Sequence, residues 1–423
     1  MTHRIRNYEV HARTPSRRDA MDIIEAGLAA IDTQAIMHEK VRLDGEILTV
    51  AHQSYNLADY EHIHVIGFGK ASCQASSALE QILGNRIASG IALTNKRSSS
   101  AACSTVKICE STHPLPTDKN VANTQSLVDE CGTISANDLV IVLVSGGGSA
   151  MLCWPASECE QGVRLYHAAN KKGLTIQQLN IIRKHISALK GGGFAKMLYP
   201  AKVIGIVFSD VPGDAPDMVA SGPTYPDAST VAEAQSIIDT FELGTFDLLE
   251  TPKEPKWFEN VDNFVLVSNE ASLQAMAKTA QHLGYGTEII ASDMYDEPEV
   301  IAQRFLSRSA PHTVILGGGE SRLTIATPGG DGGRNQHVAL TAATHITGDQ
   351  LFASIASDGL DNGESAGALV DATTVVRARA AGIDTASTLQ AFNEHPLLTA
   401  TDDLVVTGPT GANVSDLMFL LIP

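Results

Sequence analysis

Short, uninterrupted runs of Val, Ile and Leu recur along this chain and alternate with longer stretches whose apolar residues have helical spacing. A strand that is apolar at almost every position, rather than at every second one, is buried on both faces, as in a parallel sheet covered by helices. The alternation predicts an α/β fold with a doubly wound, Rossmann-like parallel sheet in the N-terminal part. The expected strands of that sheet are residues 62–68, 90–94, 106–110, 138–145 and 202–209.

Apolar spacing and turn residues predict further elements around these strands. Residues 18–31 are apolar at every third or fourth position, which predicts a helix, with Ser16 as its N-cap. Residues 41–51 predict a hairpin that turns at Asp44-Gly45. Two further helices are expected at 121–131 and 176–190.

The length of 423 residues exceeds what one ordinary hydrophobic core organises, so two domains are expected. The strand–helix rhythm breaks at 241–262, a stretch with prolines and many charges. We therefore expect one domain over residues 1–250 and a second α/β domain over residues 251–423. The strands expected in the second domain are 263–268, 287–290, 313–318, 322–327, 351–357, 403–407 and 417–422.

Charge and cysteine content narrow the class of protein. With 48 acidic and 30 basic residues the formal net charge is −18, which disfavours nucleic acid and anionic membranes as partners. The six cysteines form no CxxC pair and have no zinc-ligand spacing to histidine, so we expect reduced thiols. The N-terminal residues hold no apolar signal core, and the chain has no run of about 18 apolar residues. We expect a soluble, cytoplasmic protein with no membrane or nucleic-acid partner; the choice between monomer and homodimer is open at this stage.

Glycine-rich loops follow several of the expected strands, and ligands of parallel sheets bind at those strand ends. After the first strand, Gly67 and Gly69 precede Lys70 and the start of a helix. They match only the beginning of a dinucleotide fingerprint, because the second strand ends in Thr-Asn-Lys-Arg at 94–97, without the acidic residue that binds the ribose. A lysine beside bare backbone amides at a helix N-terminus is instead a good anion clamp.

A second loop of this kind has the sequence Ser-Gly-Gly-Gly-Ser and follows another apolar strand. Its residues are Ser145, Gly146, Gly147, Gly148 and Ser149. Glycines let backbone amides turn toward a ligand without a clash of Cβ atoms, and the two hydroxyls add hydrogen-bond donors. Because a simple turn requires fewer glycines, the loop predicts a phosphate cradle.

Carboxylates gather in two other loops that follow strands. Asp210 and Asp214 lie after the strand that ends near residue 209, and Asp358 and Asp361 lie after the strand that ends near residue 357. Mg²⁺ is commonly held through one or two carboxylates, and a general base is often a carboxylate too. These residues are therefore candidate metal ligands or bases, with turn and N-cap roles as the alternative.

The most glycine-rich stretch, residues 329–333, leads into Arg334 and Asn335 at the start of an amphipathic helix. A forked guanidinium in that position predicts a clamp for a phosphoryl group or a carboxylate. His113, which is followed by Pro114 and by a second proline two residues later, is a weaker candidate because a lone histidine is more often structural.

Together these segments resemble the glycerate kinase family that forms 2-phosphoglycerate, the two-domain type with a MOFRL C-terminal domain. The resemblance runs in order along nearly the whole chain. It rests on the segments GFGKAS, THPLPTDKN, LVSGGGSAML, IRKHISALKGGGFAK, SDVPGDAPDMVASGPTYPDAST, GGGES, GGRNQ, SDGLDNGESAGA and TGPTGANVSDL.

The resemblance implies an enzyme that phosphorylates D-glycerate with ATP and Mg²⁺, in a cleft between two α/β domains. It implies that Lys70 and Arg334 are active-site cations, which stabilise the γ-phosphoryl group or hold the carboxylate of the substrate. The expected site residues are Lys70, Arg334, Asp210 and Asp214 for catalysis, residues 145–149 with Gly67, Gly69 and Asn335 for the nucleotide, and Asp210 and Asp358 for the metal.

Three positions depart from the family's usual pattern. His337 stands where the family usually has glutamate, Thr112 where it often has glycine, and Asn362 where it often has glycine after aspartate. None of these changes removes an expected catalytic group, but they leave the identity of the sugar acid open.

Two other functions stay open on the sequence alone. An NAD(P)-dependent hydroxypyruvate reductase is favoured by the segment GFGKAS, and it is opposed by the missing ribose carboxylate and by the lack of a convincing histidine–carboxylate pair. A non-catalytic sensor of sugar acids or nucleotides is opposed by the acidic loops, which a protein that only binds anions would avoid.

Overall fold

The computed structural model describes residues 3–97, 101–211, 215–325 and 329–423. Contacts divide the chain into two compact units, each described separately below. The parallel-sheet unit consists of Thr33–Ser209 and Ala215–Leu266, and the mixed-sheet unit consists of Met1–Asp32, Asp210–Asp214 and Val267–Pro423. The division thus crosses the chain at several points, whereas the sequence predicted one boundary between residues 250 and 251.

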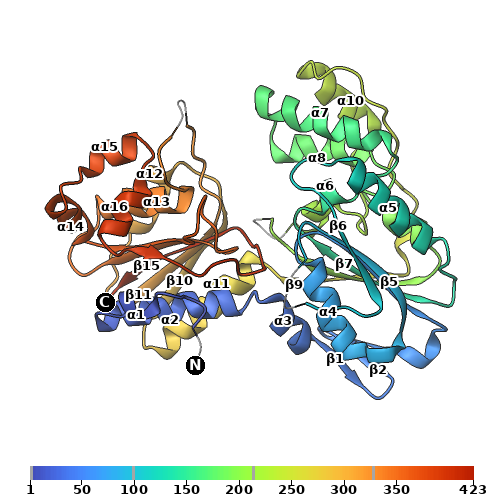
Figure 1. Cartoon of the computed structure of the whole chain (residues 1–423), viewed down its shortest axis with the longest axis horizontal. Coiled ribbons are helices and arrows are strands. Elements are labelled where there is room, and N and C mark those ends of the chain that lie inside the picture. The colour runs from blue at the N-terminus through green and yellow to red at the C-terminus, as the bar shows by residue number, and fades with distance from the viewer. Residues whose placement is uncertain (1–2, 98–100, 212–214, 326–328) are drawn as a thin grey trace. The chain divides into compact units, whose positions relative to one another are not determined.

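Six strands form the main sheet of the parallel-sheet unit, in the order β6-β5-β4-β7-β8-β9 (Figure 1). The neighbours from β6 to β8 all pair in parallel, as the uninterrupted apolar runs predicted. The strands are β4 (Ile63–Phe68), β5 (Ile87–Thr94), β6 (Val106–Glu110), β7 (Leu139–Ser145), β8 (Lys202–Phe208) and β9 (Val261–Val267).

The order of the strands reverses beside β4. The chain places β5 and β6 on one side of β4, and β7 and β8 on the other, which is the predicted doubly wound, Rossmann-like arrangement. Phe68 of β4 lies opposite Val144 of β7, and every residue of both strands is buried. The loops that leave the carboxyl ends of β4 and β7 therefore emerge side by side, at the point where such sheets bind ligands.

Helices and a small antiparallel sheet complete the parallel-sheet unit. The predicted hairpin is present as β1 (Val41–Asp44) and β2 (Ile47–Val50), and β3 (Gln53–Asn56) is a further strand that the sequence did not predict. The predicted helix at 176–190 ends earlier, as α8 (Ile176–His185). The other helices are α3 (Thr33–Lys40), α4 (Ser72–Leu83), α5 (Asp118–Cys131), α6 (Gly148–Met151), α7 (Ser157–Lys172), α9 (Gly193–Leu198) and α10 (Val231–Thr240).

The mixed-sheet unit contains a second six-stranded sheet, in the order β10-β11-β15-β12-β13-β14. Only β10 and β11 pair in parallel, and the other neighbours are antiparallel. The strands are β10 (Gly286–Met294), β11 (Thr313–Gly319), β12 (Leu351–Ala356), β13 (Gly367–Asp371), β14 (Leu404–Val405) and β15 (Asp416–Ile422). The helices are α1 (Tyr8–His11), α2 (Pro15–Ala29), α11 (Asn269–His282), α12 (Pro298–Leu306), α13 (Arg334–Ala343), α14 (Thr374–Ala380), α15 (Thr385–Gln390) and α16 (Glu394–Ala400).

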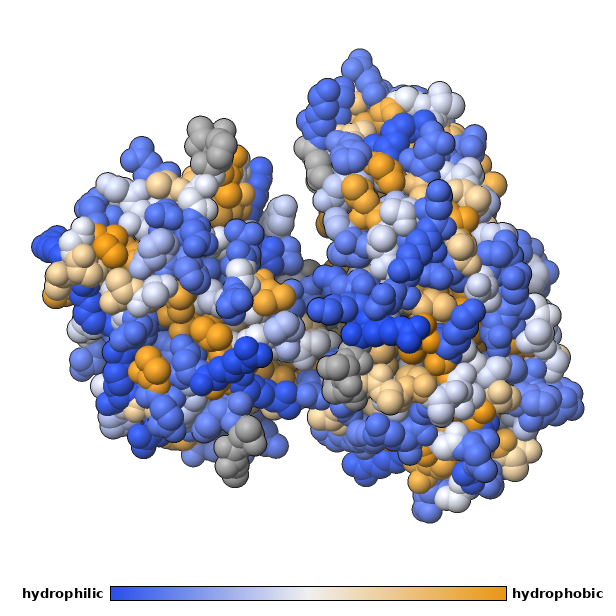
Figure 2. All heavy atoms as spheres, in the orientation of Figure 1, coloured by the Kyte–Doolittle hydropathy of each residue, from blue (hydrophilic) through white to orange (hydrophobic). Residues whose placement is uncertain are grey.

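The face of each unit that is visible in Figure 2 is mostly hydrophilic, with small hydrophobic groups scattered over it. Among the described residues, no helix has both the length and the apolar character that a membrane span requires. The six cysteines are free thiols, and five of them are buried.

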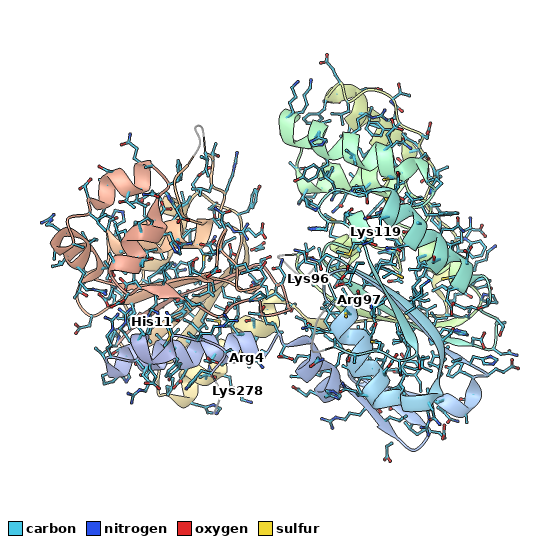
Figure 3. The ribbon with its side chains drawn as sticks, viewed as in Figure 1. Arg4, His11, Lys96, Arg97, Lys119 and Lys278 are labelled. Carbon is cyan, nitrogen blue, oxygen red and sulfur yellow. The ribbon has the colours of Figure 1, made fainter. Side chains whose placement is uncertain are left out.

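The N-terminal segment is an integral part of the mixed-sheet unit. Gly27 of α2 leaves room for α11, since its carbonyl accepts a hydrogen bond of 3.0 Å from Ser272 and a Cβ at Gly27 would meet the Met276 side chain. Arg17, which is 4% exposed, donates a 2.9 Å hydrogen bond to Asp403. His11 lies on the same segment (Figure 3). The first helices therefore stabilise a unit whose sheet comes from the C-terminal part of the chain.

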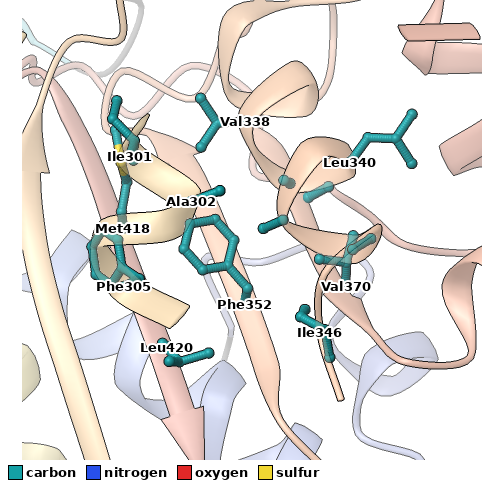
Figure 4. Packing of buried hydrophobic residues seen from close by; sticks show 14 of the residues in the cluster. Ile301, Ala302, Phe305, Val338, Leu340, Ile346, Phe352, Val370, Met418 and Leu420 are labelled. Atoms are coloured by element: carbon teal, nitrogen blue, oxygen red, sulfur yellow. The ribbon is translucent and has the colours of Figure 1, made fainter. Parts of the chain in front are cut away.

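Helices α12 and α13 cover one face of the second sheet and enclose its core (Figure 4). Phe305 of α12 packs edge-on against Phe352 of β12, with ring centroids 5.3 Å apart. Both rings are fully buried, and a burial of this kind stabilises a fold by about 2 kcal/mol per side chain. This core holds α13, which carries two of the candidate site residues, Arg334 and Asn335, at its start.

Several sequence predictions need correction. The helix predicted at 18–31 begins earlier, at Pro15, and its N-cap is Thr14 rather than Ser16, because the Thr14 hydroxyl accepts from the backbone amide of Arg17. Residues 322–325 of the strand predicted at 322–327 form no strand, and the last two residues of that range lie outside the described residues. Strand β13 was not predicted, and only two residues of the strand predicted at 403–407 belong to β14.

Candidate active site

The loops after β4 and β7 interlock in the parallel-sheet unit. The backbone amide of Ala71 donates to the Ser145 hydroxyl at 3.0 Å, and the amide of Lys70 donates to the carbonyl of Gly146 at 2.9 Å. Gly69 has a φ of +117°, and a Cβ at this position would overlap the carbonyl oxygen of Ser145. Only glycine therefore allows this close approach, which places the Lys70 backbone beside the serine–glycine loop.

The serine–glycine loop turns sharply into α6. Gly147 has a φ of +81°, and Gly148 packs so closely that a Cβ would lie 2.7 Å from that of Ala220. The hydroxyl of Ser149 is 2.9 Å from that of Ser221, and Ser221 donates to Asn180 of α8 at 3.0 Å. The loop is thus held by contacts with the loop after β4 and, through Ser221, with α8, and Gly147 and Gly148 leave no room for a larger side chain without strain or overlap.

The side chains of Lys70 and Arg183 both act on His113, which packs against this loop, and no role was predicted for Arg183. Lys70 and Arg183 are both partly buried, and neither side chain has a hydrogen bond or an ion pair with any residue in the described ranges. Partial desolvation, together with the positive charges of Lys70 and Arg183, lowers the pKa of His113 to about 4. Arg183 lies in the segment IRKHISALK, so the family resemblance contained a signal for it.

Arg334 begins α13 in the mixed-sheet unit, as predicted, but carboxylates hold its guanidinium. Its Nε and Nη2 donate to the two carboxylate oxygens of Asp416 at 2.7 and 3.0 Å, and Nη2 also donates to Glu320 at 3.1 Å. Asp416 is 1% exposed, and burial raises its pKa to about 7 although Arg334 opposes this change. Arg334 is therefore a cation in a fixed orientation. Asp416, in the segment TGPTGANVSDL, was not predicted as a site residue.

Asn335 and Asp361 form the buried start of the same helix. The Asp361 carboxylate accepts from the backbone amides of Asn335 and Gln336 at 3.0 and 2.9 Å, so it acts as a helix cap. The Asn335 side chain donates to Asp416 at 2.9 Å and accepts from Ser354 at 2.6 Å. Asn335 is 1% exposed, and its hydrogen bond to Asp416 helps to fix the orientation of that carboxylate.

A cavity of about 540 Å³ opens beside these residues within the mixed-sheet unit. This volume suits a small ligand. Asp358 is partly buried at its wall, and one of its carboxylate oxygens accepts from the backbone amide of Leu360 at 3.0 Å. Polar and charged residues of the wall include Arg334, Asp358, Asp361, Glu394, Asn413 and Asp416.

His337 occupies a fixed place next to this cavity. Its Nδ1 donates to Glu394 at 2.7 Å, and its ring stacks on that of Phe392 with centroids 5.2 Å apart. Glu394 is 1% exposed and lines the cavity. His337, at the position where the family usually has glutamate, is therefore hydrogen-bonded to the buried Glu394 in this chain.

The acidic loop after β8 is described only in part. Asp210 is partly buried, and its carbonyl accepts from the Ser415 hydroxyl at 2.9 Å. Asp214 lies outside the described residues. Asp227, further along the chain, is 7% exposed and accepts hydrogen bonds from Lys184, Ser229 and Thr251, which gives it a structural role.

The described residues contain one group with metal-ligand spacing, and it lies away from these loops. Glu61, His62 and Asp138 lie close together just before β4 and β7, at the amino ends of the strands. The phosphate-type loops leave the carboxyl ends of the same strands. A group that contains histidine is also not the all-oxygen set that Mg²⁺ prefers. Mg²⁺ binds to one or two carboxylates and keeps several waters, and Asp210 and Asp358 stay predicted ligands on the chemistry of their side chains alone.

Two family profiles match the chain. The domain of unknown function DUF4147 covers residues 19–248, and the MOFRL family covers residues 313–416. The glycerate 2-kinase of Pyrococcus horikoshii is 31% identical over 95% of this chain and 98% of its own length. This chain belongs to the glycerate 2-kinase family. The D-glycerate 2-kinase of Thermotoga maritima is also 31% identical, over 86% of the chain and 91% of its own length.

Solved structures confirm the fold of the glycerate 2-kinase family for this chain. A glycerate kinase from Thermotoga maritima matches with a TM-score of 0.83 and 29% identity, over 96% of this chain and 99% of its own. A protein from Pyrococcus horikoshii matches with a TM-score of 0.80 over 96% of this chain and 98% of its own. Two relatives from Agrobacterium vitis, 34% and 33% identical, are named provisionally as hydroxypyruvate reductases.

Proposed function

We propose that this protein is a glycerate 2-kinase, which transfers the γ-phosphoryl group of ATP to the 2-hydroxyl of D-glycerate and yields 2-phosphoglycerate and ADP. The observation that carries the proposal is the pair of interlocked loops after β4 and β7, where Lys70 meets the serine–glycine loop at the ligand-binding edge of a parallel sheet. Phosphoryl transfer depends mostly on positioning and on charge stabilisation, and these loops supply both. A cytoplasmic location, where ATP and free thiols occur together, is part of the proposal.

In this proposal the parallel-sheet unit holds the phosphates of the nucleotide. Gly67 and Gly69 let the first loop pack closely against residues 145–149, and the glycine amides of that second loop bind the phosphates together with the Ser149 hydroxyl. The ammonium group of Lys70, which has no partner among the described side chains, stabilises negative charge on the transferred group.

The mixed-sheet unit contributes the second cation. Asp416 and Glu320 hold the guanidinium of Arg334, so the guanidinium has a fixed orientation before any ligand binds. Asn335 takes part by holding Asp416. That Arg334 and Lys70 lie on two sides of one cleft stays a prediction from the family resemblance.

Mg²⁺ would be held by Asp210 and Asp358, and when bound it would offset the charge of the nucleotide phosphates. Asp214 stays a candidate for the carboxylate that accepts the proton of the 2-hydroxyl. Both carboxylates of the metal proposal are partly buried, and Asp358 lines a cavity with room for waters.

The test is to incubate the protein with D-glycerate, ATP and Mg²⁺ and to follow the reaction by ³¹P NMR. A phosphomonoester coupled to the proton on C2 supports the proposal. A product coupled to the C3 protons would place the phosphate on the 3-hydroxyl and refute the assigned position. Omission of Mg²⁺, with EDTA present, is expected to abolish turnover.

The names of the Agrobacterium vitis relatives favour one alternative, an NAD(P)-dependent hydroxypyruvate reductase. The end of β5 opposes NAD as the cofactor, because Thr94 is followed by Asn95, Lys96 and Arg97 and not by the carboxylate that binds the adenosine ribose of NAD. Oxidation of NADH by hydroxypyruvate in the absence of phosphoryl transfer would decide for the reductase.

A further inference from the structure

We propose that Arg183 and His113 complete a subsite for a tetrahedral oxyanion or a carboxylate, together with Lys70 and the serine–glycine loop. The inference rests on the proposed function, which it deepens by adding two ligand-binding residues. Within that function the anion is a phosphate of the nucleotide or the carboxylate of the hydroxy acid.

Hydrogen bonds tie the helix that carries Arg183 to the loop. Ser149 contacts Ser221, and Ser221 donates to Asn180 on α8. Arg183 lies three residues after Asn180 on the same helix, and residues at this spacing share one helix face. The turn of α8 that is anchored to the glycine loop therefore also carries the arginine.

His113 packs against the same loop. A Cβ on Gly147 would lie only 3.0 Å from Cδ2 and 3.3 Å from Nε2 of the His113 ring. The ring therefore packs directly over the positive-φ glycine of the loop. The lowered pKa of His113 keeps the imidazole neutral near pH 7, and a neutral imidazole still donates one hydrogen bond to an anion.

Among the described residues, the charged groups that act on His113 are the cations Lys70 and Arg183. The carboxylate that acts on Arg183, that of the buried Glu158, is ion-paired with Lys190. Burial lowers the pKa of Arg183, which shows that the guanidinium is poorly solvated where it lies. A partly buried cation without a counter-charge is costly, so proteins pair it or use it to bind an anion. Lys96 and Arg97 after β5 and Lys119 at the start of α5 add positive charge in the same unit (Figure 3). In a chain with a net charge of −18, this local excess indicates an anionic ligand.

The first test measures binding to the full-length protein by calorimetry. The probes are inorganic pyrophosphate, ADP with Mg²⁺, and D-glycerate alone. Arg183→Met keeps most of the aliphatic stem and removes the charge, and we expect it to weaken at least one probe tenfold or more. Lys171→Met is the control, because Lys171 is an exposed cation on α7 of the same unit. It should bind all probes within twofold of the unchanged protein.

The pattern among the probes identifies the source of the anion. Loss of pyrophosphate and ADP binding assigns the subsite to the nucleotide, and loss of D-glycerate binding assigns it to the carboxylate. Arg183→Lys should bind more tightly than Arg183→Met but less tightly than the unchanged protein, because lysine restores the charge without the paired N–H donors of a guanidinium. Unchanged affinities for all three probes in Arg183→Met would overturn the proposal.

An NMR measurement on the unsubstituted protein covers the case in which Arg183→Met does not fold. The imidazole Cε1–H signal of His113, assigned through the signal that His113→Asn lacks, should move when pyrophosphate or D-glycerate is added. A signal that stays in place at saturation with both probes contradicts the proposal. If phosphoryl transfer is absent but pyrophosphate still binds in an Arg183-dependent way, the subsite stands and the kinase assignment fails.

Discussion

The guanidinium of Arg334 and the carboxylate of Asp416 are joined by two parallel hydrogen bonds, of 2.7 and 3.0 Å, although 82 residues separate them in the chain. Asp416 is almost fully buried, whereas Arg334 keeps about a third of its side chain exposed at the cavity wall. The buried member thus fixes the direction of the exposed one. This relationship makes Asp416 a positioning residue for the proposed reaction.

Asp416→Ala should destabilise the protein by about 2 kcal/mol, because Arg334 loses two hydrogen bonds to a buried carboxylate and keeps only its contact with the exposed Glu320. Urea unfolding measures this change. Glu320→Ala removes the more exposed partner of the same guanidinium and should cost less than about 1 kcal/mol. Similar losses of unfolding free energy in the two variants would show that the burial of Asp416 does not strengthen its contribution to stability.

Lys70→Met should lower kcat/KM for phosphorylation by about a hundredfold or more, with an unchanged circular dichroism spectrum, because the cation stabilises charge that develops on the transferred group. Arg334→Met should have an effect of similar size. Lys171→Met, at an exposed position on α7, is the matched control and should retain turnover. Near-normal kcat/KM in Lys70→Met would remove the lysine from the mechanism.

Gly69→Ala should destabilise the parallel-sheet unit by more than about 2 kcal/mol, because a Cβ overlaps the Ser145 carbonyl and φ is +117°. Gly173 also has a positive φ, of +71°, but open space surrounds the position of its Cβ. Gly173→Ala should therefore cost only about 1 kcal/mol. Thermal unfolding of both variants separates the effect of steric overlap from that of backbone strain. Equal losses of stability in Gly69→Ala and Gly173→Ala would contradict the close packing of the two loops.

The stability of the protein should depend on His11 in mildly acidic solution. His11 is fully buried, its Nε2 lies 2.8 Å from the carbonyl of Leu404, and burial lowers its pKa to about 4. The unfolded chain binds the proton at a pKa of about 6.5, so between pH 6.5 and 4 the unfolded state holds more protons. The contribution of His11 is therefore complete above pH 6.5 and is lost as the pH falls toward 4, by up to about 3 kcal/mol.

His11→Asn should lack this pH dependence. The difference in unfolding free energy between the two proteins should shrink as the pH is lowered from 7 to 4, when measured by urea denaturation. His38→Asn, at an exposed position, should leave the pH dependence unchanged. A constant difference between the unsubstituted protein and His11→Asn would mean that His11 takes up a proton in the folded state.

His337→Glu, which restores the usual residue of the family, should destabilise this protein by about 2 kcal/mol, because it places a second carboxylate against the buried Glu394. The double variant His337→Glu/Glu394→Gln should recover most of the loss. His345→Glu faces the exposed Glu299 and should cost less than about 1 kcal/mol. If the double variant gains nothing, the departure from the family pattern does not act through Glu394.

The strands and the glycine loops could be predicted from the sequence because their signals are local. An uninterrupted apolar run such as 138–145 or 202–209 can be recognised without knowledge of the strands that pair with it. A glycine loop that follows such a run is recognised from the neighbouring residues in the same way. Strand β13 escaped prediction since it is short and begins with glycine. The cap of α2 was misplaced by two residues because Thr14 and Ser16 offer equivalent side chains.

The partners of the candidate site residues could not be predicted, because they come from distant parts of the chain. Nothing near Arg334 in the sequence indicates Asp416, and nothing near Ser149 indicates Asn180. Lys70 was identified through its loop, whereas Arg183 sits within an ordinary helix, where a lysine or arginine is usually solvated.

Strand β15 lies between β11 and β12, in the interior of its sheet, although it follows all the other strands in the chain. The same unit also needs α2, whose Arg17 pairs with Asp403. During translation the parallel-sheet unit has all its strands once Val267 has left the ribosome, whereas the mixed-sheet unit must wait with a central gap until the last strand is released. Helix α2 is therefore synthesised long before the elements against which it packs. Truncation or fusion at β15 should destabilise the mixed-sheet unit before the parallel-sheet unit.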